Sequence, residues 1–128
     1  MATIKVTDYH IDTADVVKLL VWENVTASDT AYPINIGKFS DKTVQIFYTS
    51  GSGSTNLMQW SNDPRANPTH ASHASAVWET MTDNLGNNIS TTTNDGYQCM
   101  ENGWWVRPTV TGGSSPIVNF ALHMKRTM

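Results

Sequence analysis

The sequence contains a single cysteine, Cys99, among 128 residues, which excludes an intrachain disulfide framework. The fold must therefore depend on a packed core, and the chain needs no oxidising compartment in order to fold. Charged residues are also scarce, at 15% of the chain, against ~25% in typical soluble domains. Ser, Thr and Asn supply the polar surface instead. This composition is typical of an ordinary secreted-type β protein, or of a protein whose surface is covered by neighbours, since neutral polar groups cost less to desolvate than charges.

The charge pattern and the lack of long apolar runs exclude several classes of partner. The net charge is −3, and the eight Lys and Arg residues are scattered, so no basic stripe for nucleic acid is present. The start of the chain lacks the charged and apolar regions of a signal peptide. The most apolar run, Val16–Trp22, is interrupted by Lys18 and is too short to span a bilayer. We therefore expect a soluble protein made in a cytoplasm, without nucleic-acid or membrane partners.

No motif in the sequence is typical of an enzyme. Nucleophile-elbow, Walker and dinucleotide-binding motifs do not occur. The glycine-rich segment Gly51–Ser54 lies between two predicted strands rather than before a helix, where a phosphate site is not expected. Most acidic residues lie in predicted turns or at strand ends, where Asp normally bonds the backbone. We expect no catalytic residues and no cofactor.

One pair of histidines, His70 and His73, has a spacing that presents two metal ligands when it lies on a helix. Here the pair follows Pro68 in a stretch of small polar residues that favours a loop. No cysteine or third histidine lies near enough in sequence to complete a tetrahedral site. We therefore expect no metal, and we interpret both histidines as solvent-exposed or as part of a contact surface.

What the sequence does contain is a series of short segments with alternating apolar residues, separated by Gly, Pro, Asn and Asp. Such alternation between turn residues is typical of β-strands in a sandwich or small barrel. We predict an all-β fold, a single-domain antiparallel β-sandwich or small barrel with long loops. From Tyr32 onward, the segments expected to form strands are Tyr32–Phe39, Thr43–Thr49, Asn56–Ser61, Val77–Thr82, Ile89–Thr92, Tyr97–Met100, Trp104–Val110 and Ile117–Met124.

We expect one β domain over residues 1–128, in which residues 1–14 form an N-terminal arm that includes a short strand. Asp15–Asn24 is ambiguous between helix and strand, and its β-branched residues favour a strand. Gly51–Ser54 predicts a hairpin between the strands on either side of it. Residues 62–76 form a loop of about fifteen residues, which is longer than the usual connection and is typical of a functional or mobile segment. We interpret it as a contact loop.

Five tryptophans are the remaining candidates for a binding role. Trp104 and Trp105 are adjacent, so on a strand they point to opposite faces, and we expect one in the core and the other on a surface covered by a partner. An exposed Trp can stack on a sugar, but in a small sandwich it more often fills a core or a protein interface, so we favour a protein partner. The partner-contact candidates are Asn62, Asp63, Pro64, Arg65, His70, His73, Trp104 and Trp105.

Four segments carry a recognisable pattern: T-V-Q-I-F-Y-T at 43–49, L-M-Q-W-S-N-D-P at 57–64, A-V-W-E-T-M-T-D-N-L-G-N at 76–87 and W-V-R-P-T-V-T-G-G at 105–113. Together they resemble the capsid decoration, or cement, proteins of tailed bacteriophages. The resemblance covers about half the chain, and its motifs are structural rather than catalytic. Met81 stands where Leu is usual, a swap that conserves volume. The loop after Pro64 departs from the pattern in length and composition.

The resemblance implies a β-sandwich or barrel bound to the outside of a phage head, often as trimers at the junctions between major capsid proteins. We therefore expect a structural virion protein on the capsid exterior, made in the host cytoplasm. Two alternatives stay open. A carbohydrate-binding module would need exposed Trp side chains coplanar on one sheet face or at one rim, and a phage tail-associated β protein would share the fold but not the location.

Overall fold

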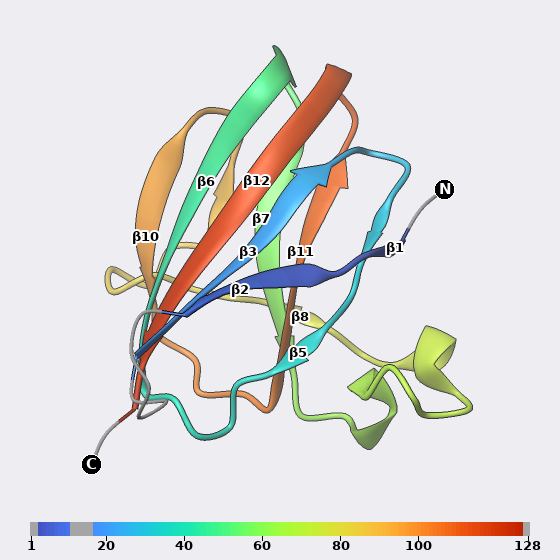
Figure 1. Ribbon diagram of the computed structural model, residues 1–128, viewed down its shortest axis with the longest axis vertical. Helices are drawn as coiled ribbons and strands as arrows, with labels where there is room; N and C mark the ends of the chain where they lie inside the picture. Colours follow the sequence, from blue (N-terminus) through green and yellow to red (C-terminus); the bar gives the residue numbers. More distant parts are fainter. Residues whose placement is uncertain (1–2, 11–16, 127–128) are drawn as a thin grey trace.

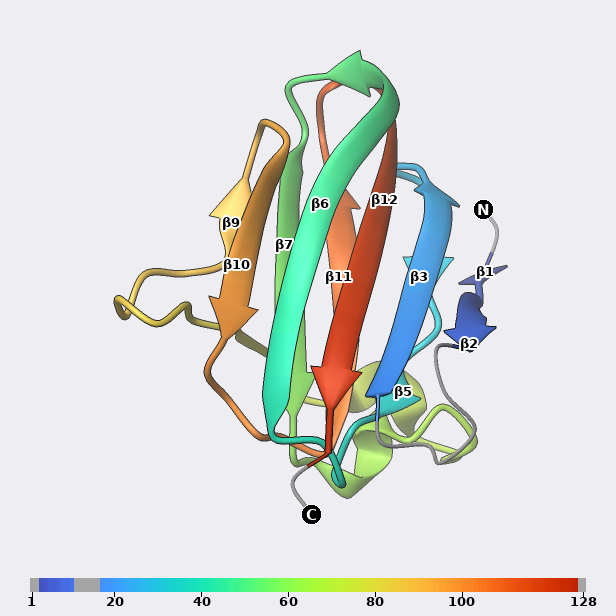
Figure 2. The same ribbon diagram turned by 60° about the vertical axis from the view of Figure 1, so that its left-hand side comes forward.

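The computed structural model describes residues 3–10 and 17–126, which form two five-stranded sheets packed face to face (Figures 1 and 2). The β12 sheet contains, in spatial order, β10 (Asp95–Cys99), β6 (Asp41–Ser52), β12 (Ser114–Lys125), β3 (Val17–Val25) and β2 (Val6–His10). The β11 sheet contains β5 (Ile34–Asn35), β11 (Trp105–Thr111), β7 (Thr55–Ser61) and β8 (Glu79–Thr80), with β9 (Ser90–Thr91) also paired to β7.

The all-β prediction is confirmed for the described residues, because their only helices are two single 3₁₀ turns, η1 (Pro64–Ala66) and η2 (His73–Ser75). None of these described helices is long and apolar enough to cross a membrane. All pairs within the two large sheets are antiparallel. The one departure is a short parallel pair between β1 (Thr3–Ile4) and β4 (Thr30–Ala31).

The core lies between the two sheets and follows from the alternation of apolar residues along the long strands. In β11, the inward residues Val106, Pro108 and Val110 are buried, and the residues between them are only half-buried. Trp22, on β3, is fully buried, and its indole nitrogen donates to the carbonyl oxygen of Tyr32 at 2.9 Å. The other large, fully buried core side chains include Val25, Ile36, Val44, Ile46, Met58, Met81, Ile89, Phe120, Leu122 and Met124.

The predicted hairpin across Gly51–Ser54 is wrong. β6 pairs with β10 and β12, and β7 pairs with β8, β9 and β11, so the chain crosses from one sheet to the other at this turn. The connection from β11 to β12, through Gly112 and Gly113, crosses back at the same end of the sandwich (Figure 2). The C-terminal β12 takes the place beside β6 that a hairpin would give to β7.

Several predicted strands differ in length from those observed. The Tyr32–Phe39 segment contributes only β5, and Val77–Thr82 contributes only β8. Their buried residues, such as Ile36 and Met81, reach the core from turns and short bridges rather than from regular strands. By contrast β6 and β12 extend to 12 residues each, beyond the predicted ranges.

The N-terminal segment forms part of the sandwich as far as the structure describes it. Of the predicted arm, residues 1–14, the described part contributes β1 and β2, and β2 pairs with β3 at the edge of the β12 sheet. The ambiguous Asp15–Asn24 segment is a strand from Val17 onward, as expected, and its first two residues lie outside the described residues.

Candidate contact surface

We predicted that one member of the pair Trp104 and Trp105 lies in the core, and this prediction is wrong. Trp105 lies on the outer face of the β11 sheet. Val106 takes the inward position, so Trp105 and Arg107 point outward from β11. The register pairs Trp105 with Ser61 and Arg107 with Gln59 on β7. Continuing the β7–β8 register by one residue places Trp78 on the outward side as well. We call the surface formed by Gln59, Trp78, Trp105 and Arg107 the tryptophan face.

Arg107 is held in place at the centre of this face by two neighbours. Its guanidinium carbon lies 4.1 Å from the centroid of the Trp78 ring, and its Nε donates to Oε1 of Gln59 at 2.9 Å. Burial lowers the pKa of the guanidinium, which nevertheless stays charged at neutral pH. The three side chains come from β11, β7 and the residue just before β8, so only the folded sheet brings them together.

Trp104 is the exposed member of the adjacent pair and lies just before β11, with 58% of its surface accessible. Its backbone is fixed on both sides: the amide donates to Oδ1 of Asn62 at 3.0 Å, and the carbonyl accepts from the amide of Ile36 at 2.9 Å. Its ring lies so close to Gly37 that a Cβ there would be 2.5 Å from it. An exposed aromatic ring with a fixed backbone is typical of an interface anchor.

The predicted contact loop, residues 62–76, is built on Asp63. The Asp63 carboxylate accepts from the Arg65 side chain, with Nη2 2.8 Å from Oδ2, and from the amides of Arg65 at 2.9 Å and Val77 at 3.0 Å. These bonds hold the pKa of Asp63 well below its usual range, and the bond from the Arg65 side chain makes the largest contribution. Pro64 begins the 3₁₀ turn, and Ala66 is fully buried. Asp63 and Arg65 therefore stabilise the conformation of the loop, and their opposite charges pair with each other.

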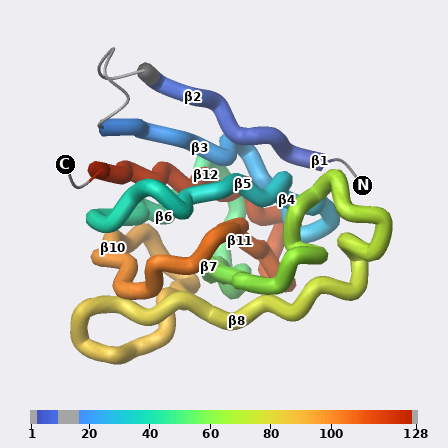
Figure 3. Tube along the Cα trace, turned by 90° about the horizontal axis from the view of Figure 1, so that it is seen from below, coloured from blue at the N-terminus to red at the C-terminus, as the bar shows by residue number. Residues whose placement is uncertain are grey.

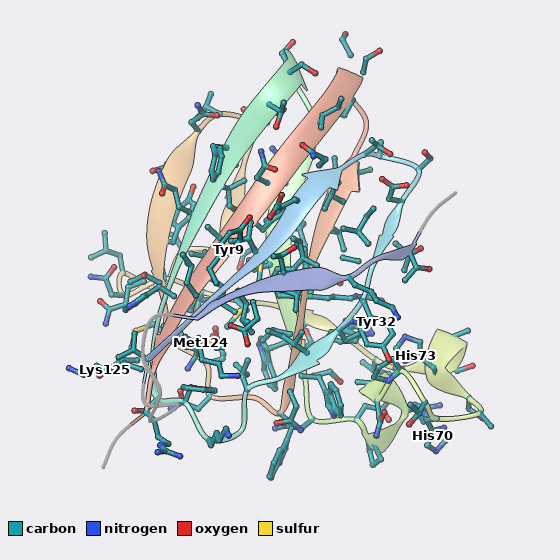
Figure 4. The ribbon with its side chains drawn as sticks, in the orientation of Figure 1. Tyr9, Tyr32, His70, His73, Met124 and Lys125 are labelled. Carbon is teal, nitrogen blue, oxygen red and sulfur yellow. The ribbon has the colours of Figure 1, made fainter. Side chains whose placement is uncertain are left out.

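His70 and His73 are held by bonds within the same loop. Nδ1 of His70 accepts from the amide of Ser72 at 3.0 Å, and Nδ1 of His73 lies 2.9 Å from the carbonyl oxygen of Arg65. In Figure 4, His73 lies beside Tyr32, whereas His70 lies on the outer part of the loop. Seen from below, the loop projects beside the sandwich next to β4 (Figure 3). Within residues 3–10 and 17–126, no group of three or more His, Cys, Asp or Glu side chains could hold a metal ion.

We expect chelation to leave the melting temperature of the protein unchanged, because the described residues place no third His, Cys, Asp or Glu side chain with the histidine pair. In addition, Nδ1 of His70 accepts from the amide of Ser72, which leaves the ring proton on its Nε2. Differential scanning calorimetry with and without a chelator measures this directly, alongside metal analysis of the untreated protein. Stoichiometric zinc together with a large drop in melting temperature after chelation would make His70 and His73 ligands instead.

Cys99 is buried, so its thiol is not accessible to a substrate. Its side chain is 3% exposed, opposite Lys42 in the pairing of β10 with β6. Burial raises the pKa of the thiol to about 12, so it is protonated at neutral pH and is a poor nucleophile. Lys42 is also buried, and its Nζ donates to Oδ1 of Asn102 at 2.5 Å and to the carbonyl oxygen of Ser40 at 3.3 Å.

The outer face of the β12 sheet carries a different surface. A hollow of about 560 Å³ there is lined by apolar side chains around Ala121, among them Leu19, Val21 and Phe47. At its rim the Tyr9 hydroxyl donates to the carboxylate of Glu23. None of the eight residues predicted from the sequence as partner contacts lines this hollow.

The structure brings most of the predicted contact residues to one end of the molecule. Asn62 bonds the backbone of Trp104, Trp105 follows on the outer face of the β11 sheet, and Asp63 and Arg65 hold the base of the loop. Sequence reasoning missed Gln59 and Arg107, and it considered Trp78 only as one of the five tryptophans. The separation of two residues between Trp105 and Arg107 would have placed both on one face of a strand. The contact with Trp78 depends on strand order, which the sequence does not reveal.

The chain matches no protein-family model and no curated protein.

Proposed function

We propose that this protein is a structural binding protein that docks on a protein assembly through the tryptophan face, Trp104 and the 62–76 loop. In line with the sequence resemblance, the assembly is a tailed-phage capsid, and the protein acts as a decoration protein that bridges major capsid proteins. A homotrimer at their junctions is the arrangement that the resemblance implies.

The observation that carries this proposal is the exposed ring of Trp104 on a fixed backbone, between the tryptophan face and a braced loop. A contact surface that is already ordered loses little conformational entropy on docking. Trp and Arg are the residues most often found as anchors at the centre of protein interfaces. The outward side chains of this sheet are mostly neutral, which lowers the cost of removing water from them.

A carbohydrate-binding module remains the second candidate, because Trp78 and Trp105 lie on the same outward sheet face. Stacking on a sugar requires an open ring face. The guanidinium of Arg107 already lies 4.1 Å from the centroid of the Trp78 ring and covers one side of it. The geometry therefore favours a protein partner over a glycan.

We expect Trp104→Ala to weaken binding to phage heads by about thirtyfold or more, the effect of losing an anchor worth ~2 kcal/mol. The ring is 58% exposed and packs beside Gly37, so the melting temperature of the variant should fall only slightly. Cosedimentation of the purified protein with undecorated heads measures the binding. Leu85→Ala is the matched control, since Leu85 is 80% exposed on a separate turn and should leave binding unchanged.

Shortening the loop within Arg65–Ser75, by replacing residues 67–72 with a short Gly-Ser linker, tests the loop separately. Asp63, Arg65 and Ala66 remain, so the variant should fold, fail to decorate heads and leave those heads less resistant to heat or low salt. Full occupancy by both variants would place the contact surface elsewhere. Binding of the wild-type protein to glycan arrays but not to heads would favour the carbohydrate-binding module.

A further inference from the structure

Arg107 is the charged side chain among the outward strand positions of the tryptophan face. Asp29 lines a small hollow beside it, but the Asp29 carboxylate accepts from the amide of Thr26 at 2.9 Å. The register of β11 with β7, and of β7 with β8, defines the outward positions around it. No carboxylate lies among these positions, which are half-buried or buried. They are Leu57, Gln59, Ser61, Thr80, Trp105 and Thr109.

The orientation of the Arg107 guanidinium is fixed by its neighbours, but no carboxylate pairs with its charge. Within the described ranges, its interactions are the bond from Nε to Gln59 and the stack on Trp78. Among the described residues, the two terminal nitrogens have no hydrogen-bond acceptor, and they reach solvent, because no buried side-chain nitrogen or oxygen there lacks a partner. Arg65 shows the contrast, because its Nη2 lies 2.8 Å from the Asp63 carboxylate. The Asp63 carboxylate already accepts hydrogen bonds from Arg65 and from the amide of Val77, so it does not pair with Arg107.

Such an arrangement costs free energy in the isolated protein. Taking a charge partly out of water is unfavourable unless an opposite charge or hydrogen-bond acceptors compensate. A planar guanidinium whose orientation is already fixed offers two parallel N–H donors, which match the two oxygens of a carboxylate. The flanking rings of Trp78 and Trp105 can exclude water from that contact when a partner covers the face.

We propose that Arg107 anchors the contact surface by binding the carboxylate of an Asp or Glu side chain on the partner protein through its two terminal nitrogens. This inference rests on the proposed function for the existence of a protein partner. It goes further in naming the chemistry of the partner's contact point, an acidic side chain presented to the outer face of the β11 sheet.

The test uses the full-length protein labelled with ¹⁵N and titrated with a short polyglutamate peptide, with polyglutamine of equal length as the neutral probe. We expect saturable shifts of the Arg107 Nε–H signal and of the Trp78 and Trp105 indole signals with polyglutamate alone. Arg107→Gln should abolish them. Arg107→Lys, which keeps the charge without the planar fork, should weaken binding about tenfold. Lys125→Gln makes the same charge change at an exposed site on the other sheet and should bind as the wild type does.

Three results would overturn the assignment. Equal peptide binding by Arg107→Gln would show that the attraction is diffuse. Inorganic phosphate shifting the same signals at lower concentration than polyglutamate would make the site a phosphate site. The same shifts on concentrating the protein alone, with self-association in analytical ultracentrifugation, would make a second copy of this chain the occupant.

Cosedimentation with heads separates this inference from the proposed function. Peptide binding at Arg107 without any binding to heads would leave the carboxylate contact standing and refute the capsid as partner. Conversely, if Arg107→Gln decorates heads fully whereas Trp104→Ala does not, the capsid function stands and Arg107 is not its anchor.

Discussion

Gly113→Ala is expected to lower the free energy of unfolding by ~3 kcal/mol, the sum of a left-handed backbone penalty and overpacking against rigid neighbours. Gly113 has φ of +83° and lies where the two connections between the sheets pass each other. A Cβ there would lie 2.6 Å from the amide nitrogen of Ser54 and 2.7 Å from the carbonyl oxygen of Ser52. Both contacts are backbone atoms, so no side chain can move aside to relieve them.

Gly112→Ala is the matched control for this prediction. Gly112 has φ of +73°, but a Cβ there would meet nothing within 4 Å. Gly112→Ala should therefore lower the free energy of unfolding only by the left-handed backbone penalty, ~1 kcal/mol. Urea denaturation of the wild type and both variants measures the difference. Equal losses in the two variants would show that the close approach between the two connections is not a feature of the protein in solution.

The second large effect is expected from Cys99 at alkaline pH. Burial raises the pKa of this thiol from 9.0 to about 12 in the folded protein. Above pH 9.0 the unfolded chain releases the thiol proton while the folded chain retains it, so the folded state loses stability as the pH rises. This loss reaches ~2 kcal/mol by about pH 10.5, at 1.36 kcal/mol for each unit between the two pKa values.

Cys99→Ala removes this pH dependence at the cost of a small cavity. Near neutral pH the variant should be less stable by ~1 kcal/mol. Near pH 10.5 it should equal or exceed the wild type, because the wild type alone carries the thiol penalty. Burial lowers the pKa of Lys42, which acts in the opposite direction in both proteins, and the Cys99 thiolate counters that shift in the wild type alone. Chemical denaturation under reducing conditions at both pH values measures the difference, and parallel stability curves would contradict the prediction.

One part of the contact surface, the 62–76 loop, could be predicted from local sequence, and the other part, the tryptophan face, could not. The 62–76 loop could be recognised from its length and its Pro-containing composition, and Asp63 and Pro64 indeed begin a capped 3₁₀ turn. The tryptophan face could not, because Gln59, Trp78 and Arg107 meet only after three segments have paired in the observed order. Trp105 was assigned to the right strand, but the choice between its two faces depends on which side the second sheet covers.

The amino-acid sequence by itself determined the class of the fold and the approximate positions of its long strands. Alternation of apolar residues has a period of two only in a strand, and this signal is local. The pairing of those strands was decided by the tertiary structure. A glycine-rich turn such as Gly51–Ser54 is compatible with a hairpin and with a crossing between sheets. The outcome depends on β12, more than fifty residues later, which packs beside β6 and completes the core with Phe120, Leu122 and Met124.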